Sequence, residues 1–535
     1  MTSERDAMLS RLAGGSVDVL VVGGGINGAV AAAALAGHGV QVALVDRADF
    51  ASGVSSHSSN LAWGGIKYLE SGEWRLVRKL CLSRNRLMDA FPSTVREIRF
   101  FTSIQRGFRM WSVLVWLGAL LYWLMGNCRM SAPRFLRRKT IIAEAPVINA
   151  SEVVGGLEYS DCYLFDNDSR FVFNFIRRAM DAGATAANYT EVTALEFSSD
   201  QQHWQVSLRD CEANRDLQLT AKVVINATGP NVDRLNATVG VDTEHHHLLS
   251  KGVHLIVDRV TPLAKVLTFF ASDGRLFFVI PMGPKTCIGT TDTQVARAEV
   301  SVSNEDRDFV LANANALLEL PEPLTRDDII AERVGVRPLA IAGADTSRDW
   351  VQLSRKHQLE IDDDRHFISI FGGKLTDCLN VGEELVAAVS QLGVITRSPE
   401  QRWYGEPDAT DRRRFLERAQ HLALDELTED GVSEPLSLRF WRRYGNYANE
   451  LLDTIGEHPD KAKLVIPEAE YTHAELELMS RREMIVHFDD FLRRRSKIAL
   501  VVPGRSLRKE STLRGAARLL FGDSAAAKLA EYLEG

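Results

Sequence analysis

Short apolar runs along the chain are each followed by a glycine turn and a helical pattern. Residues 18–22 (DVLVV) are rich in β-branched residues and predict a buried strand. The small residues at 29–39 predict a helix that packs closely on a sheet, and a second strand ends in Asp46. Two further strands are predicted at 223–228 and 367–371. This order of strand, turn and helix predicts a Rossmann-like α/β domain.

The size and charge of the chain narrow its class. At 535 residues it is too long for one simple core, so two or three structural units are expected. Apolar residues make up 45% and charged residues 25%, which is the balance of an ordinary globular protein. The net charge of −8 argues against a nucleic-acid binder.

Cysteine usage and the N-terminus predict a location. The six cysteines include no pair at CxxC spacing, which excludes a CxxC redox motif and a zinc-type pattern and favours a reduced intracellular compartment. Residues 1–16 have no long apolar core, so we expect no cleavable signal peptide. We predict a cytoplasmic protein, peripheral on the inner face of the cell membrane.

One uncharged apolar run supports that membrane contact. Residues 110–125 (MWSVLVWLGALLYWLM) are fewer than the roughly 20 residues that cross a bilayer. Tryptophans and a tyrosine lie within the run, and basic residues flank it, which is typical of a helix in the membrane interface. We therefore predict peripheral membrane contact through residues 106–139. The alternative is a buried core helix.

The first glycine turn fits G-x-G-x-x-G at Gly23, Gly25 and Gly28. Gly23 permits the tight turn, Gly25 lets the backbone approach a pyrophosphate, and Gly28 allows close contact between helix and strand. The helix N-terminus, with Asn27 in its first turn, offers free N–H groups to the phosphates. Asp46, roughly 20 residues downstream, can accept hydrogen bonds from ribose hydroxyls, which favours FAD or NAD over NADP.

Two later turns support the same nucleotide. Thr228 ends the strand at 223–228 and Gly229 and Pro230 follow it, where backbone can pass beside a bound nucleotide. Gly372, Gly373 and the residues up to Thr376 join the strand at 367–371 to an apparent helix, LNVGEELVAAV. A helix start there can address a flavin ring oxygen.

These segments, in this order, resemble the FAD-dependent, quinone-linked, membrane-associated glycerol-3-phosphate dehydrogenases. The matching motifs span nearly the whole chain: 55–59 (SSHSS), 64–70 (GGIKYLE), 156–162 (GLEYSDC), 273–275 (DGR), 280–281 (IP), 288–292 (IGTTD), 335–339 (GVRPL), 372–376 (GGKLT), 442–445 (RRYG) and 473–497. The resemblance implies FAD as cofactor. It also adds the serine-loop residues Ser55, Ser56 and Ser59 and the glycines Gly64 and Gly65 to the cofactor site, with Lys374 and Leu375 from the last turn.

Several positions depart from the family pattern. The family's arginine in the R-Y-L-E motif is Lys67 here, its usual lysine after the serine loop is Asn60, and its usual histidine before the two glycines is Trp63. After GGKLT this chain has Asp377-Cys378-Leu379 where the family commonly has Thr-Tyr-Arg. Lysine in place of arginine loses bidentate phosphate geometry.

The resemblance also supplies candidate catalytic and substrate-binding residues. We expect His254, Arg337, Lys374 and Tyr68 to be catalytic. A polyol phosphate is a dianion and needs fixed positive charges, for which Lys67, Arg355 and again Arg337 are the candidates. His254 lies on an apolar strand, where the alternative is a satisfied core histidine. The alternative for Arg355, beside Lys356 and His357, is a solvated run, and for Lys67 it is a side chain that only covers the flavin ring.

The predicted reaction is the oxidation of sn-glycerol 3-phosphate to dihydroxyacetone phosphate. Hydride goes to flavin N5, His254 takes the alcohol proton, Arg337 is an alternative that stabilises the alkoxide, and electrons pass to a membrane quinone. The alternative is a divergent flavoprotein oxidoreductase that acts on another small alcohol, phosphate ester or amino compound, with oxygen as a further candidate acceptor. A flavin-binding membrane-surface protein with little turnover is the third hypothesis.

We expect a small-molecule substrate, with homodimer assembly left open. No metal site is expected, because the run His245–His247 lies in a polar connection without a paired carboxylate or cysteine pattern. The predicted fold is α/β with a Rossmann-like FAD-binding domain, an antiparallel-sheet substrate domain and a C-terminal α-helical cap. Predicted boundaries are 15–85, 150–250 and 360–395 for the discontinuous FAD domain, 86–149 for the connecting and membrane-interface segment, 255–355 for the substrate domain and 400–535 for the helical region.

Overall fold

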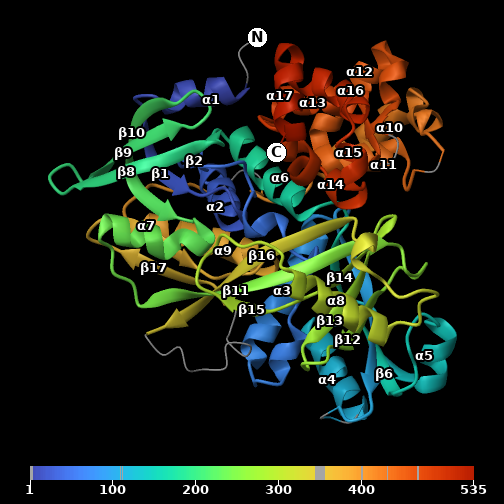
Figure 1. The fold of residues 1–535 in the computed structure, drawn as a ribbon. Coiled ribbons are helices and arrows are strands. Elements are labelled where there is room, and N and C mark those ends of the chain that lie inside the picture. The colour runs from blue at the N-terminus through green and yellow to red at the C-terminus, as the bar shows by residue number, and fades with distance from the viewer. Residues whose placement is uncertain are drawn as a thin grey trace.

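Two large sheets and a C-terminal helical region make up the molecule (Figure 1). The computed structural model describes residues 4–108, 110, 112–343, 356–398, 402–430, 432–466 and 469–534. The orange and red C-terminal helices gather at one end of the view, and α4 lies at the opposite end (Figure 1).

The first sheet has a parallel centre. Its strands are β1 (Ser16–Val22), β2 (Val42–Val45), β7 (Thr185–Ala187), β8 (Thr190–Ser198), β9 (His203–Asp210), β10 (Arg215–Asn226), β17 (Gln358–Asp362) and β18 (Phe367–Phe371). They run in the order β17-β18-β10-β1-β2-β7, and β9 and β8 continue from β10 as an antiparallel meander. The pairs between β18 and β7 are all parallel, as the predicted strand–helix alternation requires.

Side-chain alternation along β1 serves two cores. Val19 and Val21 face the helices α2 (Ile26–Gly37), α6 (Asp168–Asp181) and α9 (Cys378–Gln391). Leu20 and Val22 face the opposite side, where α1 (Glu4–Leu12) and the meander pack. A strand buried on both faces reads as a continuous apolar run, which is the pattern at residues 18–22.

The second sheet is almost entirely antiparallel. Its strands are β3 (Leu61–Ala62), β4 (Val95–Gln105), β5 (Arg134–Arg137), β6 (Val153–Leu164), β11 (His245–Asp258), β12 (Val266–Phe270), β13 (Leu276–Met282), β14 (Lys285–Gly289), β15 (Thr293–Val295) and β16 (Ala331–Ala342). The order is β15-β11-β14-β13-β12-β4-β6-β3, with β16 paired to β11 and β5 to β6. The sheet therefore takes strands from residues 61–164 as well as from the range 255–355.

Helices pack against this second sheet. They are α3 (Trp74–Ala90), α4 (Ser112–Met125), α5 (Arg138–Glu144) and α8 (Asn304–Leu317). A further helix, α7 (Val232–Val239), contacts β10 and β18 of the first sheet as well as β11 of the second. Val310 and Ala314 of α8 pack with Val253 and Leu255 of β11 in a separate apolar core. That core stiffens β11 from the face opposite the site described below.

The C-terminal region is helical apart from a small hairpin. Its helices are α10 (Ala409–His421), α11 (Leu436–Tyr444), α12 (Ala448–Glu457), α13 (His473–Arg482), α14 (Ile498–Val501), α15 (Gly504–Leu507), α16 (Glu510–Phe521) and α17 (Ala525–Glu534), with β19 (Leu464–Ile466) paired to β20 (Tyr471–Thr472). The predicted α/β fold class with an antiparallel second sheet and a helical C-terminal region is confirmed.

One prediction about local structure is wrong. The run His245–His247 was expected in a polar connection, but these residues begin β11 and pair with β16. The strand signal was missed because three consecutive histidines carry no alternation of polar and apolar positions.

A buried ionic network joins the helical region to the first sheet. Asp49, which follows β2, is fully buried and accepts hydrogen bonds from Arg494 at 2.7 Å and from Arg495 at 2.9 Å. Asn188 donates to the same carboxylate at 2.9 Å. These arginines hold the pKa of Asp49 below its usual value, although burial alone would raise it. The carboxylate therefore stays charged and fixes the C-terminal region to the loop after β2.

Removing this carboxylate tests the strength of the junction. Asp49→Asn leaves the fully buried Arg495 without its counter-ion, whereas Arg494 keeps Asp490 at 2.6 Å. We therefore expect about 3–5 kcal/mol of destabilisation, seen as a lower Tm in a thermal melt. The matched control is Asp453→Asn, which breaks an exposed pair with Arg418 and should change Tm little. Equal effects of the two substitutions would contradict the assignment.

Candidate active site

A cavity of about 300 Å³ lies where the serine loop, β11, β13, β16 and the turn after β18 converge. Its floor comes from β11 and β16, since His254 pairs with Arg333 and Gly252 with Gly335 in the antiparallel register. Alternate residues of β16 share a face, so Arg333, Gly335 and Arg337 are presented together. The structure thus brings four predicted catalytic residues, His254, Arg337, Lys374 and Tyr68, to one cavity.

The glycine turn after β1 is built for close backbone approach. A Cβ on Gly28 would lie 1.8 Å from the carbonyl oxygen of Gly23, so no larger residue fits between helix and turn. Gly23 has φ of +106°, and a Cβ there would lie 2.7 Å from the carbonyl oxygen of Ala227. Beside Gly25 the nearest atom to such a Cβ is Ser55 Oγ at 3.3 Å.

Asp46 and Ser55 hold the same turn. The Asp46 carboxylate accepts from the N–H of Gly24 at 2.7 Å and from that of Ala48 at 2.9 Å. Burial raises its pKa to about 6, and the two backbone donors oppose that rise. Ser55 Oγ accepts from the N–H of Ile26 at 2.9 Å, which ties the serine loop to the start of α2.

Other predicted cofactor residues lie around this turn. Thr228 and Gly229 come directly after β10, and a Cβ on Gly23 would lie 3.1 Å from the Cα of Thr228. Ser59 lines the cavity, whereas Ser56 is buried and donates to the backbone of its own loop at Gly53. Their contact with a nucleotide stays a prediction.

The turn from Gly372 to Thr376 meets the nucleotide motif directly. Asn27 donates through Nδ2 to the carbonyl of Gly372 at 3.2 Å. Gly372 and Gly373 have φ of +63° and +103°, a region that favours glycine. Leu375 and Thr376 line the cavity beyond them. The predicted approach of this turn to the dinucleotide motif is therefore present in the fold.

Lys374 packs its ammonium against aromatic faces. The Nζ atom lies 4.1 Å from the ring centroid of Tyr68 and 5.6 Å from that of Trp63. Trp63 donates through Nε1 to the hydroxyl of Tyr159 at 3.3 Å, which fixes its plane. Cation–π contacts of this kind stabilise a positive charge inside a cavity.

Arg337 is held in place by three acceptors. Its guanidinium donates to Thr290 Oγ1 at 3.0 Å, to Asp292 Oδ1 at 3.2 Å and to the carbonyl of Thr291 at 3.4 Å. Ser250 also donates to Asp292. The arginine therefore faces the cavity in one defined orientation.

Two buried histidines face the cavity in the neutral form. Burial, followed by the nearby charges of Arg337 and Arg333, lowers the pKa of His254 to about 3. Burial and then Arg333 lower the pKa of His57 to about 4. Within the described residues neither ring nitrogen of His254 has a hydrogen-bond partner. Such an orphaned ring needs a ligand atom to complete its hydrogen bonding.

Positive charge dominates the cavity. The described lining residues include four cationic side chains and one carboxylate, that of Asp292. The cationic side chains are those of Lys67, Arg275, Arg337 and Lys374. Gly64 and Gly65 lie outside this lining: the N–H of Gly64 donates to Asp161 at 3.1 Å. The candidate Arg355 falls outside the described residues.

The departures from the family pattern have structural partners. Asn60 is buried and accepts from Arg333 at 3.0 Å. Asp377 lies beneath the turn, where it contacts His357 Nδ1 at 2.8 Å and accepts from Ser83 at 3.1 Å. These two positions therefore support the serine loop and the glycine turn from behind.

Sequence patterns did not identify every residue in or next to the cavity lining. Arg333 is fully buried beside the lining, where it donates to the carbonyl of Ser58. It could have been found, because a two-residue period from Arg337 places it on the same face of a strand. His57 and Arg275 lie within motifs that were identified, but nothing in the motifs assigned them a role. Arg333 also bonds to Asp168 at 3.1 Å and to the carbonyl of Ser58 at 2.7 Å, and no local pattern signals these distant partners.

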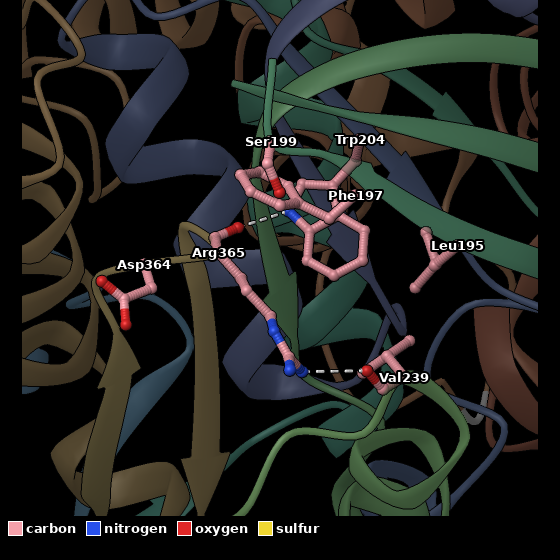
Figure 2. Close-up of a pocket in the computed structure, with 7 residues that line it drawn as sticks. All are labelled: Leu195, Phe197, Ser199, Trp204, Val239, Asp364 and Arg365. Carbon is pink, nitrogen blue, oxygen red and sulfur yellow. Dashed lines mark hydrogen bonds between the residues drawn. The ribbon is translucent and has the colours of Figure 1, made fainter. Parts of the chain in front are cut away.

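A second cavity, of about 350 Å³, lies away from this site (Figure 2). It is bordered by Trp204 and Phe197 of the meander and by Arg365, which donates to the carbonyls of Val239 and Gly240. Trp204 donates to the backbone of Arg365 at 2.8 Å (Figure 2). The N–H donors of Trp204 and Arg365 are therefore used on backbone carbonyls. The described residues contain no group of three or more potential metal ligands.

Two family models match successive regions of the chain. A family model described as FAD dependent oxidoreductase matches residues 18–358, and one described as the C-terminal domain of alpha-glycerophosphate oxidase matches residues 405–513. The aerobic glycerol-3-phosphate dehydrogenase of Bacillus subtilis is 32% identical over 391 residues, which cover 72% of this chain and 69% of that protein. The chain belongs to the family of FAD-dependent glycerol-3-phosphate dehydrogenases.

Other family members match over longer stretches. Glycerol-3-phosphate dehydrogenase 2 of Mycobacterium tuberculosis is 29% identical over 515 residues, covering 94% of this chain and 85% of that protein. The FAD complex of the glycerol-3-phosphate dehydrogenase from Bacillus halodurans has a TM-score of 0.74 at 27% identity and covers 100% of this chain and 97% of that one. The resemblance inferred from the motifs is confirmed.

This FAD-dependent oxidoreductase has a site that fits its cofactor. A Cβ at Gly23 or Gly28 would collide with backbone, so this tight turn requires glycine, whereas Gly25 leaves its backbone open to close approach apart from Ser55 Oγ at 3.3 Å. The turn at Gly372 meets this cradle through Asn27. Aligned backbone N–H groups at the start of α2 suit a pyrophosphate. The cationic cavity adjoins this cradle through the serine loop.

Replacing a cradle glycine should remove the cofactor. We expect Gly28→Ala to lose FAD during purification, because its Cβ would overlap the Gly23 carbonyl, and the absorbance ratio at 450 and 280 nm measures the loss. Gly118→Ala is the matched control, since no atom lies within 4 Å of its Cβ. Retention of FAD by Gly28→Ala at the level of the control would contradict the role of this glycine turn in cofactor binding.

Proposed function

We propose that the protein oxidises sn-glycerol 3-phosphate to dihydroxyacetone phosphate. The observation that carries this proposal is the excess of fixed positive charge in a cavity beside the nucleotide cradle. A phosphate dianion needs several cations, preferably an arginine that is already oriented. The names of the relatives, glycerol-3-phosphate dehydrogenases, support the same substrate.

Arg337 and Lys374 would both bind the anionic substrate. Arg337 is fixed by Thr290 and Asp292, so binding an anion costs little further side-chain entropy. Lys374 rests on the Tyr68 ring and offers a point charge. Lys67 adds a third charge on the same wall.

His254 is the proposed proton acceptor. It is neutral at ordinary pH because burial and two arginines lower its pKa to about 3, so its unprotonated ring nitrogen can accept a proton. A dianionic substrate would offset the two arginines and raise the pKa of His254 toward the operating range. Bound FAD supplies the acceptor for the hydride, at flavin N5.

A second candidate keeps the reaction class and changes the substrate. Trp63 and Lys67, which replace the family's histidine and arginine, both line the cavity. Trp63 adds an apolar wall, and Lys67 removes bidentate recognition. These changes favour another small alcohol, phosphate ester or amino compound as the alternative substrate.

Arg337→Ala tests the proposal. We expect KM for glycerol 3-phosphate to rise about 100-fold, because a charge-assisted, bidentate contact is worth roughly 3 kcal/mol, while FAD stays bound. Steady-state rates with an artificial dye acceptor give KM. Arg326→Ala, which removes an exposed arginine paired to Asp308, is the control. An unchanged KM in Arg337→Ala would exclude Arg337 as the phosphate ligand.

We further propose that α4 lies on a membrane surface. No described helix is long and apolar enough to span a membrane. Ala119 and Tyr122 are the buried residues of α4, whereas Val113, Leu114, Leu117 and Leu124 are 49–56% exposed. Exposed apolar patches of this kind mark interaction surfaces. This arrangement disfavours the alternative of a buried core helix.

Basic and aromatic groups border the patch. Arg106 and Arg134 have side chains that are 79% and 46% exposed, and Arg138 also faces solvent. Trp123 is only partly buried and donates through Nε1 to the carbonyl of Met130 at 2.7 Å. Such a border suits anionic headgroups. A lipid-soluble quinone is the proposed electron acceptor, because it dissolves in the membrane that α4 would contact.

The exposed leucines give a direct test. We expect Leu114→Asp combined with Leu117→Asp to lower vesicle binding at least tenfold, since each buried leucine contributes roughly 1.5–3 kcal/mol. Sedimentation with vesicles that contain anionic lipid measures the bound fraction. Ile395→Asp, at a residue that is 82% exposed outside α4, is the control. Unchanged sedimentation of the double variant would contradict membrane contact through α4.

A further inference from the structure

His247 lies behind the glycine turn of the cofactor site and contacts it directly. Its side chain is 1% exposed, and its Nε2 atom lies 3.0 Å from the backbone nitrogen of Gly372. His246, its neighbour in sequence, has a side chain that is 55% exposed. His245 is turned toward Glu360, with Nδ1 2.6 Å from its carboxylate. The three histidines therefore have different surroundings, and one of them reaches the site.

The hydrogen bond defines the protonation state of His247. A backbone N–H can only donate, so Nε2 must accept and the ring proton must be on Nδ1. The carboxylate of Asp233 lies 3.6 Å from Nδ1, which is too long for a hydrogen bond but favours a proton there. Asp233 also accepts from the backbone N–H of His247 at 3.0 Å. Burial lowers the pKa of His247 to about 4, so the ring stays neutral.

Gly372 is thereby held from two sides. His247 accepts from its N–H, and Asn27 of the dinucleotide motif donates to its carbonyl at 3.2 Å. A Cβ on the next residue, Gly373, would lie 3.4 Å from Asn27 Oδ1. Lys374 follows and places its ammonium over Tyr68. A change at His247 would therefore alter the position of both the cofactor cradle at Asn27 and the Lys374 ammonium in the cavity.

We propose that His247 is a positioning residue that, as the Nδ1–H tautomer, sets the turn Gly372–Lys374 against the FAD site. Without this acceptor the Gly372 N–H would be left unsatisfied, and the turn would shift to find another partner. The proposal concerns cofactor geometry and does not depend on which substrate the enzyme oxidises.

Three substitutions separate the hydrogen bond from packing. Gln carries its amide oxygen about as far from the backbone as imidazole Nε2, Asn only as far as Nδ1, and Met fills a similar volume without an acceptor. We expect His247→Gln to bind FAD within about twofold of the wild type. His247→Met and His247→Asn should bind FAD about tenfold more weakly, with a shifted visible flavin spectrum.

The readouts are the dissociation constant of FAD, from the quenching of flavin fluorescence as apoprotein is reconstituted, and the absorption spectrum of the loaded protein. His246→Met, at the exposed neighbour, should match the wild type. Equal affinity and an unchanged spectrum in all variants would overturn the proposal. Damage in His247→Gln as large as in His247→Met would also overturn it, because packing would then account for the effect. If the Met variant fails to fold, the comparison of Gln with Asn decides alone.

Discussion

A cavity that binds a dianion beside a flavin must hold several positive charges where water is scarce. Uncompensated buried cations are costly, so each needs a local partner. Arg337 shares one carboxylate with Ser250, and Lys374 rests on the faces of Tyr68 and Trp63. The histidines in the wall, His57 and His254, add no charge, because burial, followed by the nearby charge of Arg333 and, for His254, of Arg337, lowers their pKa values and keeps them neutral.

The scaffold fixes these groups from distant parts of the chain. The floor is the antiparallel pair of β11 and β16, stiffened by α8 from the opposite face. The cofactor side depends on the contact of Gly28 with Gly23, which brings α2 onto the first sheet. The turn after β18 connects both sides, since Gly372 bonds to Asn27 and to His247. Cofactor and substrate groups are therefore positioned by one connected set of contacts.

Local patterns predict the parts of this account that depend on neighbours in sequence. The glycine spacing at Gly23–Gly28 predicts its own geometry, because the turn, the helix start and the strand are contiguous. The motif at 335–339 similarly predicts that Arg337 faces the site. By contrast, the buried pair of Arg333 with Asp168 and the contact of His247 with Gly372 join residues more than a hundred positions apart. Such pairings depend on strand order and register, which no single segment encodes.

The environment of the apolar run at 110–125 also cannot be predicted from its own sequence. Its composition is compatible with both a core helix and an interfacial one, and only the packing of Ala119 and Tyr122 reveals which face is covered. The departures Asn60 and Asp377 also acquire meaning only in the fold, where they support the serine loop and the glycine turn. A substitution that departs from the family pattern can thus preserve a site when the new side chain supports that site through different contacts.

We propose that fixed positive charge in the cavity selects a phosphorylated alcohol for the flavin to oxidise. The most direct measurement mixes the FAD-loaded protein anaerobically with either glycerol 3-phosphate or glycerol and follows the loss of flavin absorbance. We expect rapid bleaching by glycerol 3-phosphate and little or none by glycerol at the same concentration. Failure of glycerol 3-phosphate to bleach the flavin, or equal bleaching by glycerol, would contradict it.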